Sequence, residues 1–209
     1  MVVLIMKIEP LLKFTSTIFL IFFVCGCERE SLNKLPSDAT ILAFGDSLTV
    51  GVGASSEESY PSALAEISGF NVIASGVSGE TTGQGLARLG AALEKHDPDL
   101  LILLEGGNDI LQNVGAEKTK QNLAAMIALS KGHGAEVLLI GVPEKGLFSR
   151  AAPLYEDLAE EHNIPLLSNT IGELLRDIKY KSDPIHLNGA GYALLAAAIY
   201  ERLWEEGAL

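Results

Sequence analysis

The chain has 209 residues, which favours a single domain, and 48% of them are hydrophobic, enough to form a full core. Its net charge of −12 argues against nucleic acid as a partner, because such partners require a basic surface. The only two cysteines, Cys25 and Cys27, exclude a disulfide framework within the domain and a Cys₄ or Cys₂His₂ zinc site.

The N-terminal region has the layout of a secretory signal. Basic residues precede an apolar run of about 11 residues, Phe14 to Val24, which is shorter than the roughly 20 residues that a membrane span needs. The run closes with Val24-Cys25-Gly26-Cys27, which resembles a bacterial lipobox. This resemblance implies cleavage after Gly26 and a lipid on Cys27. An ordinary secretory signal and a membrane-spanning anchor are the alternatives.

Three parts are therefore expected along the chain. They are a lipoprotein signal peptide over residues 1–26, the lipidated Cys27 with a flexible polar tether over residues 27–39, and one domain over residues 40–209. Glu28 stands where an aspartate is associated with inner-membrane retention, so we expect an extracytoplasmic protein on the periplasmic side of a bacterial outer membrane. The lipid on Cys27 is expected to be the only membrane contact, because so acidic a chain would not adsorb to anionic lipid by itself.

From Thr40 onward, apolar runs alternate with amphipathic stretches. Strands are expected at residues 41–44, 70–74, 100–104, 137–140 and 164–167, and helices at residues 59–67, 82–96, 117–131, 151–163 and 189–204, the last capped by Asn188. The run 100–104 has no polar alternation, as in a central strand covered on both faces. Crossover connections of this length indicate an α/β fold, with a five-stranded parallel sheet between helices.

Polar residues follow the ends of the expected strands. Ser47 follows the first strand, residues 75–82 the second and residues 105–109 the third, and Asp183-Pro184-Ile185-His186 precedes the last helix. The carboxyl ends of parallel strands share one edge of a sheet, where open α/β folds place their ligands. All four segments are therefore expected along one rim.

Ser47 needs a base, because a free hydroxyl is a poor nucleophile. Only His186 has a carboxylate three residues away in a turn, with the start of a helix behind it. Asp183 can accept from its Nδ1 and leave Nε2 to face Ser47. The alternatives for this motif are a surface turn capped by its own aspartate and a metal pair. The other histidines end polar helices or lie between glycines: His96, His162 and His133.

An acyl-transfer site also needs donors for an oxyanion. The candidates are the backbone N–H groups of Ser47 and Gly79 and the side-chain amide of Asn108. Ordinary turn chemistry explains Gly79 and Asn108 equally well. Asp109 is expected to hold its loop through backbone hydrogen bonds.

Taken together, these segments resemble the SGNH, or GDSL, hydrolase family. The matching residues are Gly45-Asp46-Ser47, Gly79, Gly106-x-Asn108-Asp109 and Asp183-x-x-His186. The resemblance implies a three-layer α/β/α sandwich of flavodoxin-like kind, with Ser47, Asp183 and His186 catalytic and Ser47, Gly79 and Asn108 in the oxyanion hole. Residues 78–82 and 85–89 are most similar to the bacterial periplasmic thioesterase, lysophospholipase and arylesterase branch. Members of that branch usually have proline after the histidine; Leu187 should loosen the turn.

The expected function is that of a serine esterase acting on small or medium acyl esters, with thioesters and lysophospholipids as further candidates. We expect no metal and no organic cofactor, a small acyl ester as the only substrate partner, and a monomer. The alternatives are a carbohydrate or peptidoglycan O-acetylesterase and, from another class, a non-catalytic flavodoxin-like binding module, for example for FMN.

Overall fold

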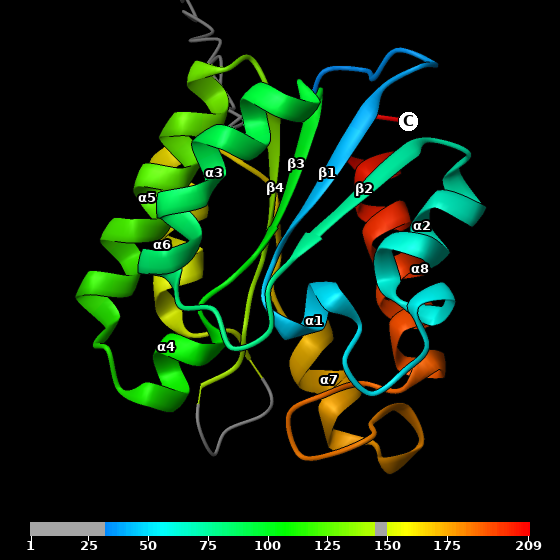
Figure 1. Ribbon diagram of the computed structural model, residues 1–209, viewed down its shortest axis with the longest axis vertical. Coiled ribbons are helices and arrows are strands. Elements are labelled where there is room, and N and C mark those ends of the chain that lie inside the picture. Colours follow the sequence, from blue (N-terminus) through cyan, green and yellow to red (C-terminus); the bar gives the residue numbers. More distant parts are fainter. Residues whose placement is uncertain (1–31, 145–149) are drawn as a thin grey trace, which may run out of the picture.

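A computed structural model describes residues 32–144 and 150–209 of the chain. Within these residues, five strands form one parallel sheet in the order β2-β1-β3-β4-β5 (Figure 1). The strands are β1 Thr40–Gly45, β2 Asn71–Gly76, β3 Leu100–Leu104, β4 Glu136–Ile140 and β5 Leu166–Leu167. The expected α/β fold with a five-stranded parallel sheet is confirmed.

Helices cover both faces of the sheet and make the three-layer sandwich. One face is covered by α3 (Thr82–His96), α5 (Ala116–Gly132) and α6 (Pro153–His162), and the other by α2 (Tyr60–Ser68) and α8 (Gly189–Glu205) (Figure 1). Shorter pieces lie in the connections: α1 (Ser47–Val50), η1 (Ser56–Glu58), α4 (Gly107–Gln112), α7 (Thr170–Arg176) and η2 (Ile178–Tyr180).

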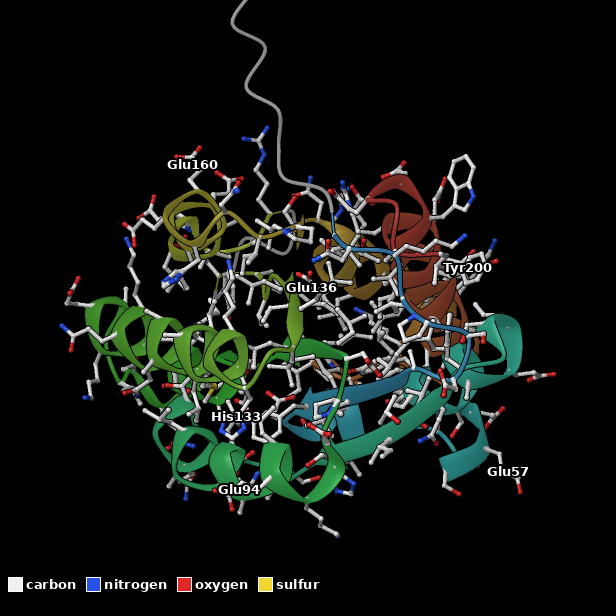
Figure 2. All side chains as sticks on the ribbon, turned by 90° about the horizontal axis from the view of Figure 1, so that it is seen from above. Glu57, Glu94, His133, Glu136, Glu160 and Tyr200 are labelled. Carbon is white, nitrogen blue, oxygen red and sulfur yellow. The ribbon has the colours of Figure 1, made fainter. Side chains whose placement is uncertain are left out.

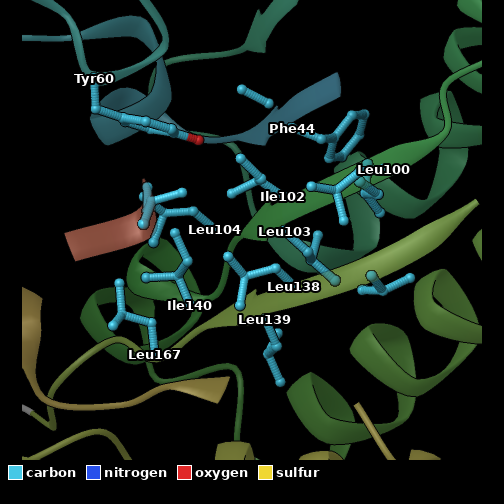
Figure 3. Packing of buried hydrophobic residues seen from close by; sticks show 14 of the residues in the cluster. Phe44, Tyr60, Leu100, Ile102, Leu103, Leu104, Leu138, Leu139, Ile140 and Leu167 are labelled. Carbon is cyan, nitrogen blue, oxygen red and sulfur yellow. The ribbon is translucent and has the colours of Figure 1, made fainter. Parts of the chain in front are cut away.

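The core lies on both sides of β3 and β4. Every residue of β3 is fully buried, as the unbroken apolar run predicts. Successive side chains of a strand point to opposite faces, so the leucines of these two strands lie on both sides of the sheet (Figure 3). A rigid central strand fixes the position of the loops at its carboxyl end.

The long elements lie close to where the sequence places them, and the short ones differ. Asn188 caps α8 as expected, by accepting from the Gly191 N–H at 3.0 Å. The helix expected from Ala151 begins at Pro153, because Ala151 pairs with Pro143 in an antiparallel bridge. The pieces α1, α4 and α7 were not among the expected helices, since four to seven residues are too few to display a helical period.

The segment before β1 is packed, which corrects the expected tether. Leu32 and Leu35 are buried in the core cluster, and the Leu35 N–H donates to the Ala208 carbonyl at 2.9 Å. Asn33 donates to the Glu136 carboxylate at the start of β4. The folded unit therefore includes residues 32–39. The expected signal peptide and Cys27 lie outside the described residues.

Of the helices in residues 32–144 and 150–209, none has the length and apolar character that crossing a membrane requires.

Candidate active site

The predicted rim exists at the carboxyl ends of β1, β2 and β3. The structure brings together Ser47, Gly79, Asn108 and His186 around one cleft of about 280 Å³. The rest of the cleft wall is mainly apolar: Leu48, Val52, Ile110, Leu111, Val142, Pro143, Ile171, Leu175 and Ile185. Polar groups thus converge at one end of an apolar cleft, which is the usual composition of a small-molecule site.

Ser47 is held at the first position of the short helix α1. The Asp46 carboxylate caps this helix by accepting from the Leu48 N–H at 3.0 Å, and Gly51 ends it in the left-handed conformation. Gly45 is required just before it, because a Cβ there would lie 2.1 Å from the Leu104 carbonyl oxygen of β3. The sharp turn out of β1 therefore places Ser47 in the cleft, with its N–H in the helical turn that leaves such groups unpaired.

His186 and Asp183 complete a chain of hydrogen bonds to Ser47. The Nε2 of His186 lies 3.0 Å from the Ser47 Oγ, and its Nδ1 lies 2.7 Å from the Oδ2 of Asp183. The other Asp183 oxygen accepts the N–H groups of Ile185 and His186, each at 2.8 Å. A carboxylate that accepts from Nδ1 leaves Nε2 unprotonated, so this His186 can take a proton from Ser47.

Two effects oppose each other at Asp183. Burial raises the pKa of its carboxyl, and hydrogen bonds from the His186 ring and from the two backbone N–H groups lower it. The hydrogen bonds prevail, so the pKa of Asp183 lies below its usual range. Asp183 therefore stays ionised, as its role beside the imidazole requires.

Leu187, which stands where a proline was expected, is itself buried and lies in a backbone-paired turn. It is fully buried, and its backbone pairs with Lys181 across the turn. The Ser182 N–H also donates to the His186 carbonyl at 3.0 Å. Burial and backbone pairing therefore hold this turn in the absence of the proline.

The other three histidines are placed far from Ser47 by the elements that carry them. His96 and His162 are the last residues of α3 and α6, and His133 follows the end of α5. These helices run back from the rim, so their carboxyl ends lie at the opposite end of the sheet. The choice of His186 among the four therefore agrees with the geometry.

The two loop donors occupy one side of the cleft. Gly79 has φ of +80°, which favours glycine. Apart from its chain neighbours, no atom of the described residues lies within 4 Å of where a Cβ would be. The Asn108 Nδ2 is held by the Glu80 carbonyl at 2.9 Å and by the Asp46 Oδ2 at 3.3 Å. Both groups line the cleft beside Ser47, where an oxyanion would form.

Arg88 braces this side of the rim, a role that the sequence did not reveal. Its guanidinium binds both carboxylate oxygens of Glu80 at 2.6–3.0 Å, the Ser75 Oγ at 2.8 Å, and the carbonyls of Ser75 and Gly45 at 3.0 and 3.2 Å. It also stacks on the Phe44 ring, 3.8 Å from the ring centroid. One side chain thus ties the ends of β1 and β2 to the loop that carries Gly79. The feature of the sequence that could have indicated this role is an arginine among the apolar positions of α3.

Buried acids lie beneath the same loops. Burial raises the pKa of Asp46 to about 6, against the opposing hydrogen bond from Leu48. Burial also raises the pKa of Glu105 to about 10, and the charge of Asp46 and the contact with Glu80 add to this. Glu105 is therefore neutral at pH 7. The protonated Glu105 can donate a hydrogen bond to the Glu80 carboxylate. This bond would supply a partner for the Glu105 Oε1, which has no other partner among the described residues.

Asp109 holds its loop, but mostly through side chains. It accepts from the Thr82 N–H at 2.8 Å and the Thr82 Oγ1 at 2.6 Å, and from the Thr119 Oγ1 at 3.3 Å. Of these three contacts, only the one with the Thr82 N–H is the kind of backbone hydrogen bond that was expected. Asp109 joins α4 to the start of α3, and this fixes Asn108 beside Gly79.

Across residues 32–144 and 150–209, no group of three or more His, Cys, Asp and Glu side chains is arranged to hold a metal ion.

Comparisons with known proteins agree with this geometry. The model of the GDSL-like lipase/acylhydrolase family matches residues 43–194. Esterase EstA from a Pseudoalteromonas species, solved with monoethylphosphonate as inhibitor, is 26% identical, with 80% of this chain and 98% of that chain covered and a TM-score of 0.72. TesA is 25% identical over 80% and 99% of the two chains, with a TM-score of 0.72. AlinE4, an SGNH-hydrolase family esterase, is 29% identical over 82% and 98%, with a TM-score of 0.59. No curated protein matched the sequence.

Proposed function

This chain belongs to the GDSL-like lipase/acylhydrolase family and is an ester hydrolase of that family, and from that premise we propose that it cleaves small or medium acyl esters through an acyl-enzyme on Ser47. The observation that carries the proposal is the continuous series of hydrogen bonds from Asp183 through His186 to Ser47, which lies at one end of an apolar cleft. A serine, a base and an orienting carboxylate within hydrogen-bond reach are the parts that nucleophilic acyl transfer needs.

The reaction follows from these contacts. The Ser47 Oγ attacks the ester carbonyl while the His186 Nε2 takes its proton, and Asp183 stabilises the imidazolium that forms. The oxyanion accepts from the N–H groups of Ser47 and Gly79 and from the Asn108 amide. When the intermediate collapses, the alcohol leaves with the proton from His186. Water then attacks the acyl-enzyme with His186 as base, releasing the acid and restoring Ser47.

The cleft supports an acyl group of limited size. Its volume of about 280 Å³ lies at the lower end of ligand pockets. Its wall beyond Ser47 is formed by aliphatic side chains from α4 and α7, among them Ile110, Leu111, Ile171 and Leu175. These contacts favour a short or medium hydrocarbon chain on the acyl side. The proposal includes thioesters as well as oxygen esters, because both present a carbonyl that Ser47 can attack.

Labelling with a fluorophosphonate tests the proposal. Such probes phosphonylate an activated serine, and the inhibited EstA structure supports the use of a phosphonate on this fold. Wild-type protein should be labelled on Ser47, and Ser47→Ala should lose both labelling and hydrolysis of p-nitrophenyl butyrate. Ser62→Ala, an exposed serine on α2, serves as the matched control. Full activity in Ser47→Ala would overturn the proposal.

A series of p-nitrophenyl esters from acetate to decanoate, with matching thioesters, then defines the acyl preference. The proposal expects highest kcat/KM at short to medium chains. A sharp preference for acetate would instead support an O-acetylesterase acting on carbohydrate or peptidoglycan.

We further propose that the mature protein is anchored by a lipid on Cys27, and the lipobox-like Val24-Cys25-Gly26-Cys27 supports this. Globomycin should leave a larger precursor if the proposal holds, and an unchanged band on a gel would contradict it.

A further inference from the structure

The end of the domain opposite the rim carries two exposed aromatic side chains on α8. Trp204, the only tryptophan in the chain, is 67% exposed, and Tyr200, one helical turn earlier, is 37% exposed. Figure 2 looks onto the amino ends of the strands, with Glu136 near the middle of this face and Tyr200 on the outer side of α8. We call the surface formed by Glu136, Tyr200 and Trp204, beside which Leu32 and Leu35 are buried, the amino-end face. Exposed tryptophan and tyrosine are typical of surfaces at a membrane interface.

The chain enters the domain at this same face. Leu32 and Leu35 are buried, and Leu35 is hydrogen-bonded to Ala208, four residues beyond Trp204. Cys27 precedes Leu32 by only five residues. Even a fully extended chain covers at most about 18 Å over five residues. A lipid on Cys27 would therefore hold the amino-end face within about 18 Å of the bilayer.

The cleft lies at the far end of α8. His186 is three residues before this helix begins, and the helix has 17 residues, which at 1.5 Å per residue spans about 25 Å. Figure 1 shows the same separation, with the C-terminus at the end where β1 begins and with α1 and α7 at the other end. Turning the cleft onto the anchoring bilayer would lift Leu32 about 25 Å above it, farther than the chain from Cys27 reaches.

Apolar surface alone would favour the opposite orientation. The rim also carries exposed aliphatic side chains: Val50, Val77, Leu111, Val114, Ile178 and Ile185. These would bind a lipid surface if the domain were free to turn. The chain between Cys27 and Leu32 is too short to let the rim bind the leaflet that holds the anchor. The length of this segment therefore decides the orientation.

Local charge at the amino-end face is partly neutralised. Arg202 pairs with Glu205 at 3.5 Å and with Glu206 at 3.2 Å, close to Trp204 in the last turns of α8. These pairs lower the repulsion that an acidic chain would meet at an anionic headgroup surface.

We propose that the amino-end face rests on the bilayer that carries the Cys27 lipid, with Trp204 and Tyr200 among the headgroups, and that the cleft opens away from that bilayer. The substrate is then an apolar acyl ester that arrives from the aqueous side, dispersed or presented by another surface, and not a lipid of the anchoring leaflet. This inference rests on the proposed esterase function and on lipidation of Cys27.

Fluorescence of the single tryptophan tests the orientation. The lipidated full chain, its lipid verified by mass spectrometry, is reconstituted into phosphatidylcholine vesicles with brominated acyl chains. Trp204 should be quenched relative to vesicles without bromine. In the matched reporter Trp204→Phe with Ile178→Trp, the tryptophan replaces an 81% exposed residue of η2 near the rim and should not be quenched. A chain without the lipid, an unquenched Trp204, or equal quenching of both reporters would overturn the proposal.

Hydrolysis of lysophosphatidylcholine tests the consequence for substrate. Placed only in the anchoring vesicles, it should be cleaved at least about ten-fold more slowly than in separate vesicles, because a linker that cannot span gives almost no effective concentration. Inserting 20 Gly/Ser residues between Ser31 and Leu32, with a typical reach of about 25 Å, should remove this difference. Equal rates without the insertion would overturn the orientation. Turnover of soluble p-nitrophenyl butyrate separates this failure from failure of the esterase function, which alone would abolish that turnover.

Discussion

The Nδ2 of Asn108 lies 2.9 Å from the carbonyl oxygen of Glu80 and 3.3 Å from the Oδ2 of Asp46. The shorter contact fixes the amide beside Gly79. In the longer contact, the second amide hydrogen points toward Asp46, the residue before Ser47. An N–H···O contact of 3.3 Å is beyond the optimal range and is easily exchanged. An oxyanion in the cleft can therefore replace Asp46 as acceptor while Glu80 keeps Asn108 in position.

Removing this amide should slow the chemical step. For Asn108→Ala we expect kcat on p-nitrophenyl butyrate to fall by about 10²–10³, with KM little changed, because the lost donor acts mainly on the oxyanion. Asn71→Ala, at the amino end of β2, is the control and should retain kcat. A kcat for Asn108→Ala within about three-fold of wild type would remove Asn108 from the oxyanion hole.

Asp183→Asn should lower kcat by about 10²–10⁴ at neutral pH, because an amide can donate to Nδ1 and stabilise the wrong histidine tautomer. The backbone contacts from Ile185 and His186 can persist on the amide oxygen, so the melting temperature should change little. Steady-state kinetics and thermal melts measure both, with the exposed Asp38→Asn as control. Unchanged kcat in Asp183→Asn would show that His186 is oriented without this carboxylate.

Arg88 should affect catalysis by positioning the loop that carries Gly79. Arg88→Lys keeps the charge but cannot reach Glu80, Ser75 and Gly45 together, because an ammonium lacks the planar fork of donors. We expect kcat to fall about ten-fold and KM to change less than about two-fold, since the acyl wall of the cleft is untouched. Arg202→Lys, at the opposite end of the domain, is the matched control. Lower thermal stability with unchanged kcat would assign Arg88 a structural role alone.

Glu105 should make the fold less stable as pH rises. Its pKa is raised to about 10 in the folded protein, so its stabilising contribution is complete below the ordinary value near 4.5 and is lost as pH rises toward 10. Glu105→Gln removes this titration. The variant should gain up to about 4–5 kcal/mol of unfolding free energy relative to wild type between pH 5 and pH 8.5. Urea melts at both pH values measure the gain, and a pH-independent difference would contradict the buried neutral acid.

The sequence by itself determined the fold class and the order of the site segments. Unbroken apolar runs such as Leu100–Leu104 encode burial locally, and helical spacing of leucines marks Thr82–His96, so both could be assigned without the fold. The pairing of His186 with Asp183 was also accessible, because three residues separate them and a turn brings them together.

Only the tertiary structure decided the contacts between separate strands. The sheet order places β1 between β2 and β3, and this brings Arg88 to Glu80 and Gly45, and Asn108 to Asp46. The tertiary structure also buries Leu32 and Leu35 beside the end of α8. These two residues belong to the segment that was predicted to be a tether because of its polar composition. Local patterns record which side chains are buried, but which buried groups meet depends on how the sheet is assembled from distant segments.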